Sequence, residues 1–163
     1  MYENIRDGQY RFRGSHASRA EDLVNAKFFG RIVDVLMVAP LVGFEYKRRA
    51  EENRADNAEK SVFPEQLQKA NYYLELNYKT IMLLDEDYEP DENVRADKAF
   101  RVSPKNREPA DLERYESYVR GGVDLLYEKL IGEGSLEDER LMDLYYFVED
   151  FYSRHYLDVI SDR

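Results

Sequence analysis

The run from Asp85 to Glu92, DEDYEPDE, is the densest group of carboxylates in the chain. Asp85, Asp87, Glu89 and Glu92 are spaced as the oxygen ligands of a calcium ion would be. However, a calcium loop needs a glycine at its sharp turn, and Pro90 occupies that place. We therefore interpret the run as a solvated acidic turn, and we expect neither a metal site nor a cofactor.

Residue types that support catalysis form no recognisable motif. The two histidines, His16 and His155, belong to no HExxH or similar pattern, and no serine lies in a nucleophile elbow. An acid–base pair that forms only on folding would leave no motif. The chain has no cysteine, which excludes disulfides, thiolate nucleophiles and thiolate metal ligands. We therefore predict no catalytic residues, no enzyme activity, and a reducing, cytoplasmic location.

Arginines beside aromatic rings are the clearest sign of a binding chemistry. Arg11 and Arg13 flank Phe12, and guanidinium groups suit phosphates while aromatic rings suit bases. The candidate nucleic-acid contacts are Arg11, Arg13, Arg19, Lys47, Arg48 and Arg49. The alternative is that these cations pair with acidic residues elsewhere on the chain or on a partner subunit.

The charge is distributed unevenly along the 163 residues. The chain has 24 Lys and Arg against 34 Asp and Glu, a net charge of -10, which argues against uniform coating of DNA. Residues 1–50 are net positive, so residues 51–163 carry the whole acidic excess. The chain has fourteen tyrosines and no tryptophan. So many tyrosine rings exceed what one small core needs, and tyrosine suits interfaces. An acidic, tyrosine-rich surface indicates protein binding or, as an alternative, imitation of DNA.

Gly121 and Gly122 lie inside an otherwise helical pattern. Each costs a helix about 1 kcal/mol relative to alanine, so the pair indicates a helix break or a close backbone approach. The structural interpretation is tight helix packing, and the functional one is a surface that a partner approaches. The candidate partner interface is Tyr118, Arg120, Gly121, Gly122, Tyr145 and Tyr152.

The elements that must position these residues are mainly helices. The alternation from Gln9 to Arg13 predicts a short strand or arm, and Ser15 is expected to cap a helix through Asn25. An apolar helix should run from about Lys27 to Ala39, where Pro40 kinks or stops it. Residues 47–60 have almost nothing to bury and are expected to form a solvated helix extension or loop.

The second half of the chain continues the helical pattern. A helix is expected from Pro64 to about Asp85, a short one within residues 94–101, and a long one from Asp111 that Gly132 ends. Ser135 is expected to open the last helix. We predict a mainly α, single-domain helical bundle of about five helices over residues 1–163, with a short N-terminal β-strand or ribbon. The apolar run of residues 28–46 is too interrupted to span a bilayer, so we expect no membrane contact.

Two stretches carry a resemblance to a known family. The first contains Asp34-Val35-Leu36, then Leu41-Val42-Gly43-Phe44 and a basic pair, and it resembles the pattern in the small proteins associated with DNA phosphorothioation (Dnd) systems. The second, residues 118–126, is similar to that family's Tyr-Ala-Asn-Gly-Gly element, although Arg120 replaces the asparagine. The resemblance implies an accessory component of a bacterial DNA-modification or anti-phage defence system, without a known activity.

Three hypotheses about function follow. The first is a non-catalytic adaptor subunit that docks onto larger subunits of a defence or DNA-processing complex. The second is a small DNA-binding protein that contacts phosphates through the N-terminal arginines and the step from Lys47 to Arg49. The third is an acidic inhibitor that imitates DNA. Homo-oligomerisation stays open under all three.

Overall fold

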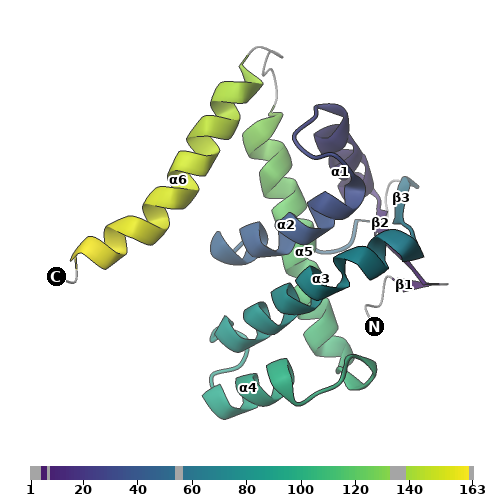
Figure 1. Cartoon of the computed structure of the whole chain (residues 1–163), viewed down its shortest axis with the longest axis vertical. Coiled ribbons are helices and arrows are strands. Elements are labelled where there is room, and N and C mark those ends of the chain that lie inside the picture. Colours follow the sequence, from purple (N-terminus) through teal and green to yellow (C-terminus); the bar gives the residue numbers. More distant parts are fainter. Residues whose placement is uncertain (1–4, 7, 54–56, 133–138, 162–163) are drawn as a thin grey trace.

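The computed structural model describes residues 5–6, 8–53, 57–132 and 139–161, and the side chains of residues 8–53, 57–132 and 139–154. The fold is mainly helical, as predicted (Figure 1). The helices are α1 (Ser15–Asn25), α2 (Ile32–Glu45), α3 (Pro64–Leu84), α4 (Glu92–Phe100), α5 (Pro109–Leu130) and α6 (Arg140–Ser161), and η1 (Pro104–Asn106) is a 3-10 turn. The strands are β1 (Ile5–Arg6), β2 (Gln9–Arg13) and β3 (Glu59–Val62).

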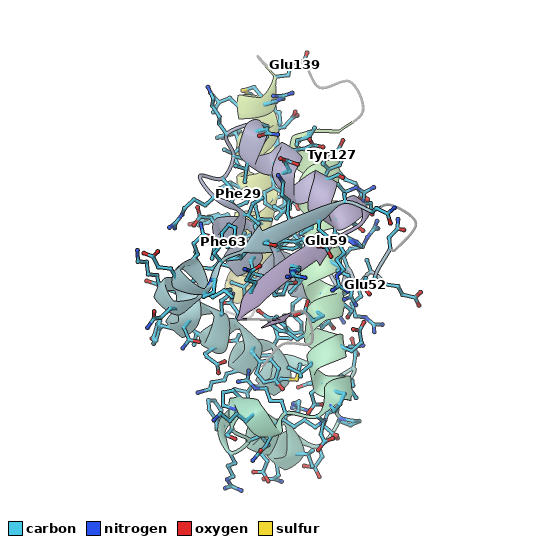
Figure 2. The ribbon with its side chains drawn as sticks, turned by 90° about the vertical axis from the view of Figure 1, so that its right-hand side faces the viewer. Phe29, Glu52, Glu59, Phe63, Tyr127 and Glu139 are labelled. Carbon is cyan, nitrogen blue, oxygen red and sulfur yellow. The ribbon has the colours of Figure 1, made fainter. Side chains whose placement is uncertain are left out.

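The three strands form an antiparallel sheet in the order β1-β2-β3. The alternation predicted for β2 is confirmed, because Tyr10 and Phe12 are buried while Arg11 and Arg13 are only partly covered. β3 was not expected, since the sequence predicts a helix extension or loop there. It pairs with β2 from Tyr10 opposite Val62 to Arg13 opposite Glu59. Figure 2 shows β2 and β3 side by side, with Glu59 on β3.

The first helix begins one residue away from its predicted cap. Gly14, with a φ of 57°, is the N-cap, and Ser15 is the first helical residue. The Gly14 amide donates to the carbonyl of Ala58, next to β3, and only glycine adopts such a left-handed backbone at low cost. The Ser15 hydroxyl instead accepts a hydrogen bond from Asn53 at 3.3 Å. The predicted Ser15 cap is therefore wrong, because the sheet fixes the chain direction at Gly14.

Pro40 neither stops α2 nor marks its end. The helix begins at Ile32 rather than Lys27 and continues past the proline to Glu45. A proline inside a helix costs about 3 kcal/mol, through its missing donor and a clash with the preceding turn. Burial of half of the α2 residues in the core outweighs that cost. The prediction of a helix ending at Ala39 is therefore wrong.

Glycines allow α2 and α5 to touch backbone to backbone. A Cβ on Gly43 would lie 2.1 Å from the carbonyl oxygen of Tyr118, and one on Gly122 would lie 1.8 Å from that of Ala39. A Cβ on Gly121 would lie 2.1 Å from the carbonyl oxygen of Arg48. The helix is not broken at the glycine pair. The structural interpretation of Gly121 and Gly122, tight helix packing, is therefore confirmed.

α6 stands apart from the other helices along much of its length (Figure 1). The expected opening of this helix at Ser135 lies outside the described residues. Within them, the helix begins at Arg140, after a turn that the Met142 amide closes onto the carbonyl of Glu139. Among the described helices, none has both the length and the apolarity that a membrane span requires.

Candidate interaction surface

Most of the six candidate nucleic-acid contacts face an acid of the same chain. Arg13 lies 3.4 Å from Glu52 and 3.5 Å from Glu59, and Arg19 lies 2.5 Å from Asp124. The remaining ion pairs join Lys47 to Asp87 at 3.3 Å and Arg48 to Glu128 at 2.9 Å. Among the described residues, no carboxylate lies within ion-pair distance of the two other cations, Arg11 and Arg49. The alternative of internal pairing accounts for four of the six, and DNA contact stays a prediction.

Four of the six candidate partner contacts lie inside the molecule. Tyr118, Arg120, Gly121 and Gly122 are buried in α5, against α2 and the segment that follows it. Arg120 donates to the carbonyl of Ala50 at 2.8 Å and pairs with Glu113. These four positions cannot form a contact surface in this fold, because α2 already occupies the space in front of the glycines.

The acidic turn is exposed or partly exposed except at its first residue. Asp85 is buried, and its carboxylate accepts hydrogen bonds from Arg114 at 2.7 and 2.9 Å and from the Tyr118 hydroxyl at 2.9 Å. Burial first, and then the hydrogen bond to Asp85, raise the pKa of Tyr118 to about 12. The prediction that the whole turn is solvated is therefore wrong for Asp85, which holds α3 to α5.

A second buried carboxylate links α1 to α5. Asp124 accepts a hydrogen bond from Arg19, and His16 Nε2 lies 3.4 Å from the same oxygen. Burial by itself would raise the pKa of Asp124, but the hydrogen bonds from His16 and Arg19 lower it below its ordinary value. The ionised form is therefore the one that the fold favours.

We expect the ion pairs of Asp124 to make the free energy of unfolding depend on pH in the acid range. Because the pKa of Asp124 is lower in the folded chain, its contribution is complete above the unfolded value of about 3.9 and is lost as the pH falls through the folded pKa. Asp124→Asn should therefore cost about 1.5–3 kcal/mol at pH 7 and less at pH 3. Urea unfolding at both pH values measures this, and an equal cost at the two would contradict it.

The inner side of α6 is fixed to the end of α2 by one tyrosine. The Tyr46 ring stacks on Phe147 with 6.0 Å between ring centroids, and its hydroxyl donates to Asp150 at 2.6 Å. Arg154 lies over the same ring, 4.1 Å from its centroid, and pairs with Asp150 at 3.1 Å. Burial first, and then the hydrogen bond to Asp150, raise the pKa of Tyr46 to about 12, so the phenol stays protonated at neutral pH.

The outer side of α6 carries a stripe of exposed apolar side chains. Leu141 is 74% exposed, Tyr145 58%, Val148 56% and Tyr152 57%. Their spacing of four, three and four residues places them along one line of the helix. We call these four residues the outer α6 face. Of the candidate partner contacts, only Tyr145 and Tyr152 lie here, and both are exposed as an interface requires.

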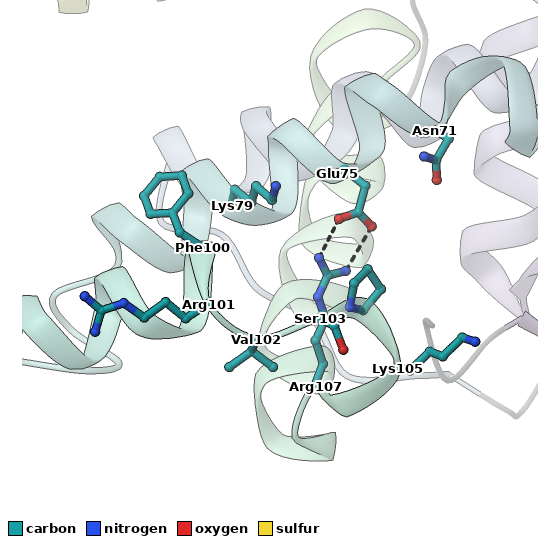
Figure 3. Close-up of a pocket in the computed structure, with 10 residues that line it drawn as sticks. Asn71, Glu75, Lys79, Phe100, Arg101, Val102, Ser103, Lys105 and Arg107 are labelled. Carbon is teal, nitrogen blue, oxygen red and sulfur yellow. Dashed lines mark hydrogen bonds and ion pairs between the residues drawn. The ribbon is translucent and has the colours of Figure 1, made fainter.

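A pocket that sequence reasoning missed lies between α3 and the segment that follows α4 (Figure 3). Its volume is about 600 Å³, and its lining includes Lys79, Arg101, Lys105 and Arg107 but, among the described residues, only one carboxylate, Glu75. We call it the cationic pocket. A signal was present, because residues 98–107 contain four cations and no acid within the acidic part of the chain. The net negative charge of residues 51–163 as a whole masks this basic segment.

Comparisons with protein-family models, curated proteins and solved structures found no match to this chain.

Proposed function

We propose that this chain is a non-catalytic adaptor that binds a larger protein through the outer α6 face. The observation that carries the proposal is the exposure of Leu141, Tyr145 and Val148 along one line of α6. Aromatic and aliphatic anchors of this kind supply most of the binding energy at protein interfaces. An apolar stripe left in water would otherwise favour aggregation.

The charges beside the stripe define the chemistry of the partner. Residues 139–154 contain Glu139, Asp143, Glu149 and Asp150 against two arginines, so this part of α6 is net negative. A complementary surface would present an apolar strip bordered by lysines and arginines. The resemblance to Dnd-associated proteins suggests that the partner is a subunit of a bacterial DNA-modification or anti-phage defence complex. Such subunits handle DNA and commonly have basic surfaces.

A photo-crosslinking residue in place of Tyr145 tests the proposal in the native host. We expect one dominant cross-linked protein, resistant to nuclease, which mass spectrometry identifies as a component of a DNA-modification or defence complex. The same crosslinker in place of Tyr72, which is 70% exposed on α3, is the matched control and should not capture that protein.

A substitution within the stripe separates a specific contact from mere proximity. Val148→Asp, combined with the crosslinker at position 145, should reduce the cross-linked product at least ten-fold, because it places a charge in the middle of an apolar contact. Capture of nucleic acid instead of protein would favour the DNA-binding hypothesis. Capture of only a second copy of the chain would contradict the adaptor proposal.

A further inference from the structure

The cationic pocket is electrostatically opposite to the rest of the protein. Its lining carries a net charge of +3, within a chain whose net charge is -10. Lys79 and Lys105 have no carboxylate within ion-pair distance among the described residues. Arg101 pairs with Asp97 at 2.6 Å, but its side chain is 80% exposed, so water screens that pair strongly. The positive charge of this pocket is therefore largely available to an anion.

Contacts with Glu75 and Tyr78 hold Arg107 in place within the lining of the pocket. Arg107 donates two hydrogen bonds to Glu75, at 3.1 and 2.6 Å (Figure 3). Its guanidinium lies 3.7 Å from the centroid of the Tyr78 ring. The Arg107 side chain is 1% exposed. Its Nε atom is buried and has no hydrogen-bond partner among the described residues. Glu75 and Tyr78 therefore fix the Arg107 guanidinium, and the lysines of the lining remain for a ligand.

The wall beside the lysine is apolar. Phe100, the last residue of α4, is 62% exposed, and Val102 also belongs to the lining. Figure 3 shows Phe100 at the same edge of the pocket as Lys79. An exposed phenylalanine next to a free cation matches a ligand that joins a flat ring to a negative group. The volume of about 600 Å³ is within the usual range for small-molecule sites.

We propose that the cationic pocket binds a nucleoside phosphate, with the phosphate beside Lys79 and the base against Phe100. Lysine is a common phosphate ligand, and a base can stack on any exposed aromatic ring. Glu75 opposes the phosphate by its charge, while it holds Arg107 in place. The site is separate from the outer α6 face, so the two proposals stand or fall independently.

The test compares AMP with its two parts on the purified full chain. We expect isothermal titration calorimetry to show saturable binding of AMP, at least ten-fold tighter than binding of ribose 5-phosphate or of adenosine. Equal affinity for adenosine and AMP would exclude phosphate recognition and overturn the proposal. Equal affinity for ribose 5-phosphate and AMP would exclude a role for the base and overturn it as well, as would the lack of saturable AMP binding.

Two variants with opposite expected effects distinguish binding from structural damage. Lys79→Met should weaken AMP binding about ten-fold, as the loss of one charge-assisted hydrogen bond does. Glu75→Gln removes the only carboxylate of the described lining and should strengthen AMP binding, whereas a general structural defect would weaken it. Lys69→Met is the matched control, because Lys69 lies on the same helix but pairs with Glu65 outside the pocket. An equal effect of the Lys69 and Lys79 variants would overturn the assignment.

Discussion

Gly122→Ala should unfold the protein or cost more than about 3 kcal/mol of stability, at the upper end of what overpacking does to a core. The added Cβ would lie 1.8 Å from the carbonyl oxygen of Ala39 and 2.6 Å from its carbonyl carbon. Neither atom belongs to a flexible side chain, so α2 and α5 would have to move apart as whole helices. Since single domains have free energies of unfolding of about 5–15 kcal/mol, this substitution could remove much of the stability of the protein.

Gly30→Ala is the matched control for this prediction. Its Cβ would meet only the end of the Asp34 side chain, at 3.5 Å, which is ordinary contact. We expect its free energy of unfolding, measured by urea titration with circular dichroism, to stay within about 0.5 kcal/mol of that of the parent. Equal midpoints for Gly122→Ala and Gly30→Ala would show that the two helices do not approach as closely as described.

The second large effect is expected at Asp85. Asp85→Ala removes the acceptor of two Arg114 hydrogen bonds and one from Tyr118, and leaves the Arg114 guanidinium mostly buried without its counter-charge. Breaking a buried ion pair from one side typically costs about 3–5 kcal/mol. Asp87→Ala, two residues away, is the control. Asp87 is 70% exposed and pairs with Lys47 at the surface, so its loss should cost at most about 1 kcal/mol.

A double-mutant cycle distinguishes the loss of the Asp85–Arg114 ion pair from other effects of the substitution at position 85. If the cost of Asp85→Ala arises from the unpaired guanidinium, the additional change Arg114→Met should recover part of the stability. Urea unfolding of the two single variants and the double variant measures the coupling. Strictly additive costs would contradict the interpretation that Asp85 and Arg114 act as a pair.

The local sequence was sufficient to predict an element wherever that segment has a clear hydrophobic periodicity. The alternation of Tyr10 and Phe12 defines β2, and the apolar spacing from Leu67 to Met82 defines α3. β3 has no such signal, because Val62 is its only buried residue and its hydrogen bonds are to a strand far back in the chain. Residues 59–62 therefore form a strand because they pair with β2, and the local sequence alone does not predict it.

Local rules failed where a distant contact outweighs them. Proline ends an isolated helix, but at Pro40 the packing of α2 in the core dominates. Asp85 belongs to a run that is otherwise solvated, and only its proximity to Arg114 in the fold distinguishes it. The motifs at residues 34–44 and 118–126, which suggested a family, meet at the contact between α2 and α5. Their glycines therefore serve helix packing.

The candidate sites divide in the same way. The exposure of Tyr145 and Tyr152 on α6 agrees with a sequence that has more tyrosines than one small core needs, and their role in an interface stays a prediction. The cationic pocket combines Lys79 of α3 with residues 100–107, and periodicity cannot bring these two segments together. A charge count over short windows finds the second segment but not its partner. Pairing of the arginines with acids was an open alternative, but the particular acids that pair with Arg13, Arg19 and Arg48 are equally invisible before folding.

The close contact of α2 with α5 has a consequence for the nascent chain. α2 leaves the ribosome well before α5 does. In the folded protein, Gly121 and Gly122 of α5 contact the backbone of Ala39 in α2 and of the segment that follows α2. At a synthesis rate of about 5–20 residues per second, the delay is on the order of 10 seconds. Throughout that interval the most apolar helix of the protein lacks its main partner and is exposed to aggregation. Holdase chaperones recognise segments of this kind, so α2 is where we expect one to bind during translation.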